Sequence, residues 1–375
     1  MSGLLQEIGE RAQRLGVPFA VHLDVTYRCN EQCVHCYLDH HDHGEMTTVE
    51  IKNLLNELAE AGVFVLSLSG GEIFMRRDIF EIIEHARALM FCVKLKTNAV
   101  MIHEEQAARL RDLDIQSIQI SIYSHRPEVH DAITKLPGSL RRSITAIRFL
   151  KSQGLRVVMA NVLMTENMQD HHGVKALAEE LGAEYTLDPT VTPMMDGERS
   201  TVALNAGESA LQTLFRDESY VGNADEFCSP PAAMDEASKD SLPCSAGHTI
   251  CYVSPYGELY PCVQFPYSCG NVRQQRFIDI WKNSPQMKEV RSIRLRDLSS
   301  CSQCAHGASC TRCPGLAFLE GNMRGPSTAD CEKSFARTGV PSANLLAKKE
   351  KSSPRRLVQI QLVPVVTGTR LAASL

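Results

Sequence analysis

A unit of one apolar strand followed by one amphipathic helix, repeated along the first half of the chain, is the feature that most constrains the fold. The first unit is "FAVHLDVT" followed by "TTVEIKNLLNELAEAG", where Thr47 and Glu50 have the spacing of a capping box and the apolar residues share one helical face. Four similar units follow, and "AEYTLD" supplies a sixth strand. Six strands alternating with helices predict a parallel sheet with helical crossovers, either open or curled into a partial barrel.

Polar and glycine-rich clusters come directly after these strands. A cysteine-rich loop follows the first strand, "GGE" the second, "TNA" the third and "YSHRPEVHD" the fourth. The carboxyl ends of parallel strands lie at one edge of a sheet, so we expect these clusters to meet there and form a functional site.

Composition limits the class of protein. The chain has 375 residues, of which 43% are hydrophobic, and a prior of about 150 residues per domain suggests two domains. A net charge of -5 gives no general attraction to nucleic acid or anionic lipid. The N-terminal stretch lacks the apolar core of a signal peptide, and no run approaches the roughly 18 apolar residues of a membrane span. We predict a cytoplasmic protein with no nucleic-acid or membrane partner.

Fourteen cysteines in such a chain indicate metal ligation or catalysis rather than disulfides. In "CNEQCVHCYLDHHDHGEM", Cys29, Cys33 and Cys36 form C-x3-C-x2-C, close enough to hold three corners of an iron-sulfur cube. The fourth iron would then be left for a substrate or cofactor, as in an open catalytic metal site. The alternative is a zinc knuckle, completed by one of four histidines: His35, His40, His41 or His43.

This cysteine motif after a first strand resembles the signature of the radical S-adenosylmethionine (SAM) enzymes, and "SGGEIF" resembles their second motif. The resemblance implies that SAM binds the open iron, and that an electron from the reduced cluster cleaves it to a 5'-deoxyadenosyl radical. The second motif matches the residues that hold the methionine amino group in this family: Ser69, Gly70, Gly71 and Glu72. Ile73 is a departure, because the family usually has Pro there.

Two further stretches carry the resemblance. "KTNA", with Thr97 and Asn98, resembles the family's "TNG", and "SIYSHRPEVHDAITKLPGS" resembles the stretch in which Ser121 would approach the SAM ribose. His130 and Asp131 could form an acid/base pair, but we favour a role in organising the loop before the next helix. The resemblance covers residues 20–190 and implies a partial (β/α)6 TIM-like barrel of the α/β class.

The C-terminal cysteines resemble a SPASM domain, an extension of radical SAM enzymes that carries two auxiliary 4Fe-4S clusters. By the family pattern, the first cluster would be held by Cys244, Cys251, Cys262 and Cys313, and the second by Cys301, Cys304, Cys310 and Cys331. The C-x2-C spacing from Cys310 to Cys313 departs from the usual C-x3-C. Zinc remains the alternative for such pairs. The resemblance thus implies three 4Fe-4S clusters and SAM as cofactors, and leaves Cys92, Cys228 and Cys269 outside them.

We expect five segments along the chain. They are an N-terminal helix (1–19), the radical SAM core (20–190), a bridging region with one helix around "ESALQTLF" (191–243), the SPASM domain (244–337) and a basic tail that contains the β-prone "LVQIQLVPVV" (338–375).

The resemblance implies an enzyme that modifies a ribosomally made peptide or small protein by crosslinking, oxidation or epimerisation, with a haem-type or other cofactor precursor as the alternative substrate. It also implies a reductant such as flavodoxin or ferredoxin. Val263 stands where the sulfatase-maturing branch has an Asp base, so that activity is not carried over and the base is unassigned.

Only 19 residues precede the first strand, too few for a leader-recognition domain. We therefore expect either a separate recognition protein or direct peptide binding by the bridging region and tail. Two other classes are a non-catalytic iron-sulfur electron carrier, which would not need "GGE" and "TNA", and a zinc-stabilised binding module, which would not contain iron.

Overall fold

The core is a single sheet wrapped into a partial barrel. In the computed structural model, which describes residues 2–195, 198 and 200–352, nine strands form one sheet in the order β6-β5-β4-β3-β2-β1-β7-β8-β9. The six predicted strands are present and pair in parallel in sequence order. They are β1 (Ala20–Thr26), β2 (Val65–Gly70), β3 (Cys92–Thr97), β4 (Ser117–Ser121), β5 (Val157–Val162) and β6 (Glu184–Asp188). The α/β fold with a partial (β/α)6 barrel is confirmed.

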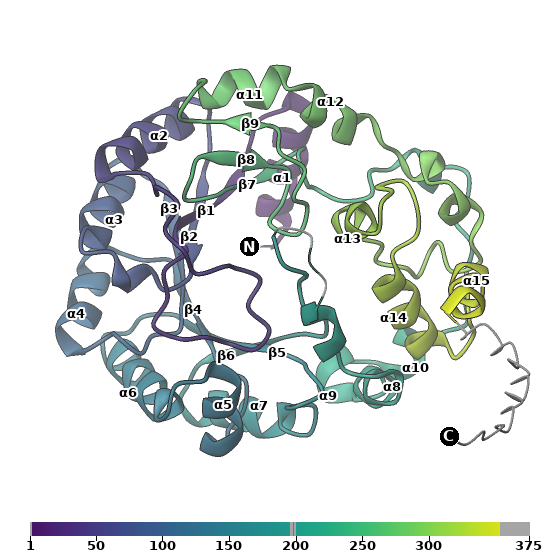
Figure 1. The fold of residues 1–375 in the computed structure, drawn as a ribbon, viewed down its shortest axis with the longest axis horizontal. Helices are drawn as coiled ribbons and strands as arrows, with labels where there is room; N and C mark the ends of the chain where they lie inside the picture. The colour runs from purple at the N-terminus through teal and green to yellow at the C-terminus, as the bar shows by residue number, and fades with distance from the viewer. Residues whose placement is uncertain (1, 196–197, 199, 353–375) are drawn as a thin grey trace, which may run out of the picture.

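Helices cover the outer face of this sheet along one rim of the molecule (Figure 1). They are α2 (Thr48–Glu60), α3 (Ile79–Ala88), α4 (Glu104–Asp112), α6 (Ser139–Ser152) and α7 (His171–Glu180), with the short α5 (Pro127–Thr134) between β4 and α6. The helix α2 begins with the predicted capping box, in which the side chains of Thr47 and Glu50 each bind the other's backbone N–H.

The strands have one apolar face and one polar face. In β1, Val21 and Leu23 point to the helices and belong to the main apolar core, whereas His22 lines a cavity on the inner side. The inner side chains of the barrel therefore form the site, and the outer ones hold the helices.

A C-terminal hairpin extends the same sheet. Strand β7 (Ile250–Val253) pairs in parallel with β1, and β8 (Glu258–Tyr260) and β9 (Gly270–Asn271) follow in antiparallel pairing. Two helices, α11 (Phe277–Asn283) and α12 (Pro285–Ser292), cover this part, and the fully buried Trp281 donates its indole N–H to the carbonyl of Gly16 at 2.8 Å. Sequence analysis did not place these strands beside β1.

The remaining helices lie on the other side of the molecule in Figure 1. The predicted bridging helix is α8 (Glu208–Phe215), followed by α9 (Glu218–Val221) and α10 (Ala224–Phe227), while α13 (Pro314–Leu319), α14 (Thr328–Thr338) and α15 (Ala343–Ser352) come from the C-terminal part. Short 3-10 turns are η1 (Ile73–Met75), η2 (Ser200–Leu204), η3 (Ser238–Asp240), η4 (Leu295–Asp297) and η5 (Ser300–Gln303).

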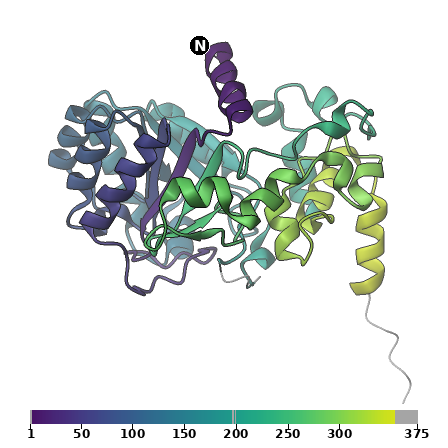
Figure 2. The same cartoon turned by 90° about the horizontal axis from the view of Figure 1, so that it is seen from above.

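The first helix, α1 (Ser2–Leu15), projects from the body of the protein (Figure 2). No helix within the described part of the chain is long and apolar enough to cross a membrane. The stretch "LVQIQLVPVV" (357–366) lies outside the described residues.

Candidate functional site

The cysteine loop lies between β1 and α2, over the carboxyl ends of the strands. Cys29, Cys33 and Cys36 are all half-buried and line one cavity of about 1240 Å³ that includes its open mouth. Val34 in this loop donates its backbone N–H to the carbonyl of Ile133 at 3.0 Å, which ties the loop to α5. Three thiols on one anchored loop, facing a cavity large enough for a small molecule, fit a three-cysteine metal cluster with one open position.

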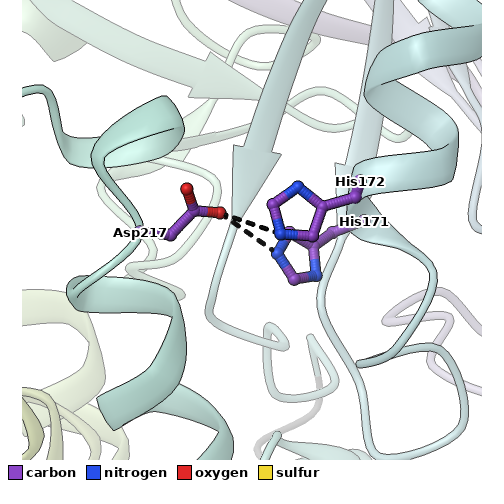
Figure 3. A group of neighbouring side chains, drawn as sticks. All are labelled: His171, His172 and Asp217. Atoms are coloured by element: carbon purple, nitrogen blue, oxygen red, sulfur yellow. Dashed lines mark ion pairs between the residues drawn. The ribbon is translucent and has the colours of Figure 1, made fainter.

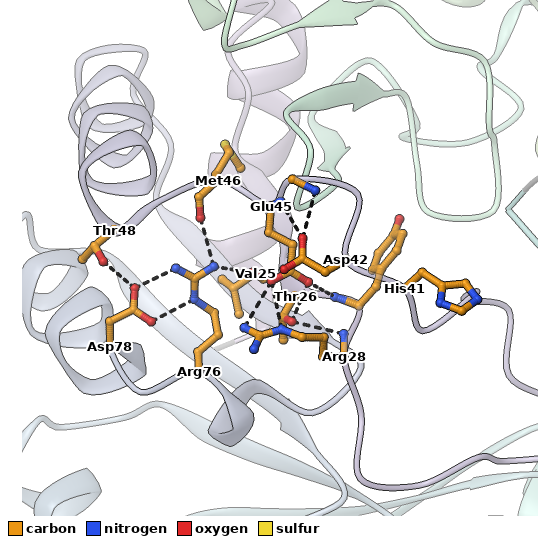
Figure 4. Close-up of polar contacts among 12 residues, drawn as sticks. Val25, Thr26, Arg28, His41, Asp42, Glu45, Met46, Thr48, Arg76 and Asp78 are labelled. Carbon is orange, nitrogen blue, oxygen red and sulfur yellow. Dashed lines mark hydrogen bonds and ion pairs between the residues drawn. The ribbon is translucent and has the colours of Figure 1, made fainter.

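Buried polar contacts fix both ends of this loop (Figure 4). The guanidinium of Arg76, 6% exposed, donates to the carbonyl of Val25 before the loop and to that of Met46 near its end, at 2.9 and 3.0 Å. The carboxylate of Glu45 reaches back to the hydroxyl of Thr26 at 2.7 Å. The loop is therefore closed by side chains at its base, which restricts where the cysteines can lie.

The two glycines after β2 allow the cysteine loop to pack against this strand end. Gly70 has a φ of +132°, and a Cβ there would lie 2.1 Å from the carbonyl oxygen of Thr26. A Cβ on Gly71 would lie 2.3 Å from the carbonyl oxygen of Arg28. Only glycine permits this approach. Both glycines and Ser69 line the cavity, so this motif presents its backbone there.

Glu72 lies beneath the cavity. Its fully buried carboxylate accepts hydrogen bonds from Thr97 Oγ1 at 2.8 Å, from the N–H of Asn98 at 2.8 Å and from the N–H of Phe74 at 3.0 Å. Burial raises the pKa of this carboxyl. Thr97 and Asn98 themselves line the cavity, and the Asn98 amide donates to Asn30 in the cysteine loop at 2.7 Å. Glu72 therefore holds the cavity residues Thr97 and Asn98 in place, whereas the two preceding glycines line the cavity themselves.

The stretch after β4 supplies one cavity residue and a scaffold. Ser121 lines the cavity at the end of β4. His130 is 1% exposed, burial lowers its pKa to about 4, and its Nδ1 accepts the backbone N–H of Tyr123 at 3.2 Å. Asp131 accepts from the hydroxyl of Ser139 at 2.8 Å at the start of α6. His130 and Asp131 thus organise this loop.

The cysteines predicted to hold the auxiliary clusters lie in the C-terminal half. Four of them surround one smaller cavity of about 440 Å³, in the set assigned to the second auxiliary cluster: Cys301, Cys304, Cys310 and Cys331. Four thiols around one space fit a closed four-cysteine cluster.

Two family models match this chain. The radical SAM superfamily model matches residues 23–178, and the model of the iron-sulfur cluster-binding SPASM domain matches residues 244–314. The first match includes Cys29, Cys33 and Cys36, and the second includes all of the predicted auxiliary-cluster cysteines except Cys331. The chain is a radical SAM enzyme with a SPASM domain.

The alignments with similar proteins cover most of this chain. Mycofactocin maturase MftC from Mycobacterium tuberculosis is 29% identical over 95% of this chain and 93% of its own length. An AdoMet-dependent heme synthase from Oleidesulfovibrio alaskensis is 27% identical over 79% of this chain and 82% of its own length. Among solved structures, Streptococcus suis SuiB bound to its precursor peptide SuiA has a TM-score of 0.68 at 16% identity, covering 84% of this chain and 76% of that one, so it shares the fold.

In the SPASM domain, three of the four cysteines assigned to the first auxiliary cluster lie near one another. Burial raises the pKa of the Cys244 thiol, and the neighbouring Cys262 adds to the rise. Burial also raises the pKa of the Cys313 thiol, and Cys262 adds to that rise. The Cys313 thiol lies 3.8 Å from the side-chain oxygen of Gln264.

The fourth, Cys251, has a different environment. In the parallel pairing of β1 with β7, Cys251 lies opposite Val21 and Tyr252 lies opposite His22. Tyr252 therefore points into the barrel, and Cys251 points outward into the apolar core, where it is 2% exposed and packed in the same cluster as Cys269. Burial raises the pKa of the Cys251 thiol, and Cys269 and Cys262 add to the rise, so this thiol lies near both of them.

Three further cavity residues of the radical SAM domain escaped sequence analysis: Glu31, Lys96 and Asp188. Glu31 is 3% exposed, and burial raises its pKa to about 7. Lys96 lies in "CVKLKT", where polar residues alternate with buried ones, and this alternation in a barrel strand is the signal that could have identified it.

Proposed function

We propose that this radical SAM enzyme modifies a ribosomally made peptide or small protein by crosslinking, oxidation or epimerisation. The observation that carries the proposal is its end-to-end similarity to mycofactocin maturase MftC, 29% over 95% of the chain, combined with two cysteine groups that line two separate cavities. The cavity is lined from both halves of the chain, since Val263 and Gln264 of the SPASM domain face the radical SAM residues.

Cys29, Cys33 and Cys36 would hold a 4Fe-4S cluster and leave one iron for SAM. When bound and reduced, this cluster supplies the electron that cleaves SAM to a 5'-deoxyadenosyl radical. The chain's own residues position SAM: the backbone of Gly70 and Gly71 would accept from its amino group, and other cavity residues would contact its remaining groups, namely Ser69, Thr97, Asn98 and Ser121. Glu72 would act through Thr97 and Asn98.

We further propose two auxiliary 4Fe-4S clusters in the SPASM domain (244–337), and hence three clusters in all. The second would be held by the four cysteines of the smaller cavity. The first would be held by Cys244, Cys262 and Cys313, with Cys251 as the family-derived fourth ligand. An electron donor such as flavodoxin or ferredoxin would reduce the radical SAM cluster. We also propose a cytoplasmic location, because thiols are kept reduced there.

The second candidate substrate is a haem-type precursor. It is favoured by one observation, the similarity to AdoMet-dependent heme synthases at 27% identity over about four fifths of the chain. MftC matches a larger part of this chain, so we rank the peptide first.

The test is to incubate reduced, cluster-loaded enzyme and SAM with short peptides encoded beside the gene, with and without any neighbouring recognition protein. We expect loss of hydrogens from the peptide, or uptake of solvent deuterium, in the mass spectrum. Peptides labelled with deuterium should transfer the label to 5'-deoxyadenosine. Unchanged peptides, together with modification of a tetrapyrrole in the same assay, would reverse the ranking.

A further inference from the structure

His171, His172 and Asp217 form a cluster outside the cavities described above (Figure 3). The two histidines begin α7 of the radical SAM domain, and Asp217 is the N-cap of α9 in the bridging region. Asp217 Oδ2 lies 3.5 Å from Nε2 of His171 and 3.2 Å from Nε2 of His172. One ligand atom from each residue lies within 4.8 Å of the other two, which is a separation that a single metal ion can span.

Hydrogen bonds at His171 Nδ1 and Asp217 Oδ1 orient the opposite atoms, His171 Nε2 and Asp217 Oδ2, for binding a cation. Nδ1 of His171 lies 3.1 Å from the carbonyl oxygen of Met168. A carbonyl only accepts, so Nδ1 carries a proton and Nε2 of the neutral ring presents a lone pair. Asp217 Oδ1 accepts the N–H of Ser219 at 2.9 Å, which fixes the carboxylate. Metal-ligating histidines commonly donate their second N–H to a backbone carbonyl in this way.

Two polar atoms in the cluster are left without a hydrogen bond. Nε2 of His171 and Oδ2 of Asp217 are buried, and neither has a hydrogen-bond partner among the described residues. Two acceptors facing each other at 3.5 Å need a positive charge between them, either a metal ion or a proton on the ring.

The surroundings leave room for one more ligand. His171 and Asp217 are 14% and 16% exposed, whereas His172 is 62% exposed, so one side of the cluster is open. It opens to a groove that Tyr185 also lines. Lys175 lines the same groove and would weaken cation binding, but its ammonium already donates to the Ser219 carbonyl at 2.8 Å.

We propose that His171, His172 and Asp217 bind one divalent transition-metal ion, with zinc as the ion that two imidazoles and one carboxylate suit best, and with water in the fourth position. The ion would join the first turn of α7 to the start of α9, and so fasten the bridging region to the radical SAM domain. Its nitrogen and oxygen ligands would distinguish this ion from metal bound at the cysteine sites, where the ligands are sulfur.

The experiment uses the full chain with its iron-sulfur clusters reconstituted, so that the cysteines are occupied. The protein is titrated with zinc chloride, desalted, and analysed for zinc content and by zinc X-ray absorption. We expect one zinc per chain with nitrogen or oxygen neighbours at about 2.0–2.1 Å. Zinc should also raise the unfolding temperature of the wild type, because a ligand that binds only the folded state stabilises it.

Three variants sharpen this test. His172→Ala removes an exposed ligand, and Asp217→Asn keeps an oxygen for the Ser219 N–H while removing the charge; each should lower zinc affinity by about tenfold or more. The control is His85→Ala, which removes a histidine of α3 that is hydrogen-bonded to Asn56 of α2. This variant should bind zinc like the wild type.

Three results would refute the proposed site. They are a desalted protein that contains no zinc, zinc with sulfur neighbours at about 2.3 Å, or equal zinc affinity in the wild type and His172→Ala. Failure to bind zinc would assign the charge between His171 and Asp217 to a proton.

Discussion

The hydroxyl oxygen of Thr97 lies 2.8 Å from each carboxylate oxygen of Glu72, beneath the cavity. This contact joins the motif after β2 to the motif after β3. The residues that face the cavity therefore depend on a carboxylate that does not line it.

Glu72→Ala should weaken both folding and SAM binding. It leaves the buried hydroxyl of Thr97 and the N–H of Asn98 without their acceptor, at a cost of about 1–3 kcal/mol for each group. SAM affinity should fall because Asn98 and the adjacent glycine turn lose their support. Denaturant unfolding and calorimetric SAM titration measure the two effects, with the exposed Glu128→Ala as a control. Unchanged SAM affinity in Glu72→Ala would refute the supporting role.

Gly71→Ala should disrupt the radical SAM site selectively. The added Cβ would lie 2.3 Å from the carbonyl oxygen of Arg28, so the cysteine loop must move. We expect loss of SAM cleavage and of about 4 irons per chain, with the SPASM clusters retained. Gly207→Ala is the matched control, since a Cβ there would meet nothing within 4 Å. Full activity in Gly71→Ala would contradict the close packing of loop and strand.

Replacing cysteines one at a time tests the first auxiliary cluster. Cys262→Ala and Cys251→Ala should each lose that cluster, whereas Cys269→Ala, which lies outside the proposed ligand set, should retain it. Iron analysis and electron paramagnetic resonance of the reduced protein distinguish the two outcomes. Retention of the cluster in Cys251→Ala would instead remove Cys251 from the ligand set.

Stability should decrease in mild acid because of His130. Burial lowers its pKa from 6.5 to about 4, so the folded protein keeps this ring neutral while the unfolded chain takes up a proton below pH 6.5. Its contribution is fully present above pH 6.5 and is lost as the pH falls towards 4. Between pH 7.5 and 5.5 the loss should be about 1 kcal/mol.

This loss is measured by comparing the wild type with His130→Asn, which keeps an acceptor for the Tyr123 N–H without titrating. The wild type should lose more unfolding free energy than the variant over this range. Parallel pH profiles would exclude His130 as the cause.

Local patterns predicted the six core strands and the helices between them. Strand alternation and helical periodicity are properties of adjacent residues, and parallel connections bring the motifs after successive strands to one edge. The capping box at Thr47 and the helix at "ESALQTLF" were predicted for the same reason.

The features that escaped prediction depend on residues far apart in the chain. The family pattern places Cys251 with the other SPASM cysteines, but the direction of its side chain is fixed by the pairing of β7 with β1. Similarly, the motif suggests that Glu72 contacts SAM, whereas the fold buries its carboxylate against Thr97. His171 and His172 are adjacent in sequence, but only the fold brings Asp217 to them.

Formation of 5'-deoxyadenosine from SAM tests most directly the central claim that the chain cleaves SAM at Cys29, Cys33 and Cys36. The reduced wild type, loaded with about 12 irons, should form it. The variant with all three cysteines changed to Ala should hold about 8 irons and form none. Cys301→Ala should still cleave SAM but fail to modify a peptide substrate. A triple variant that forms 5'-deoxyadenosine as fast as the wild type would contradict the account.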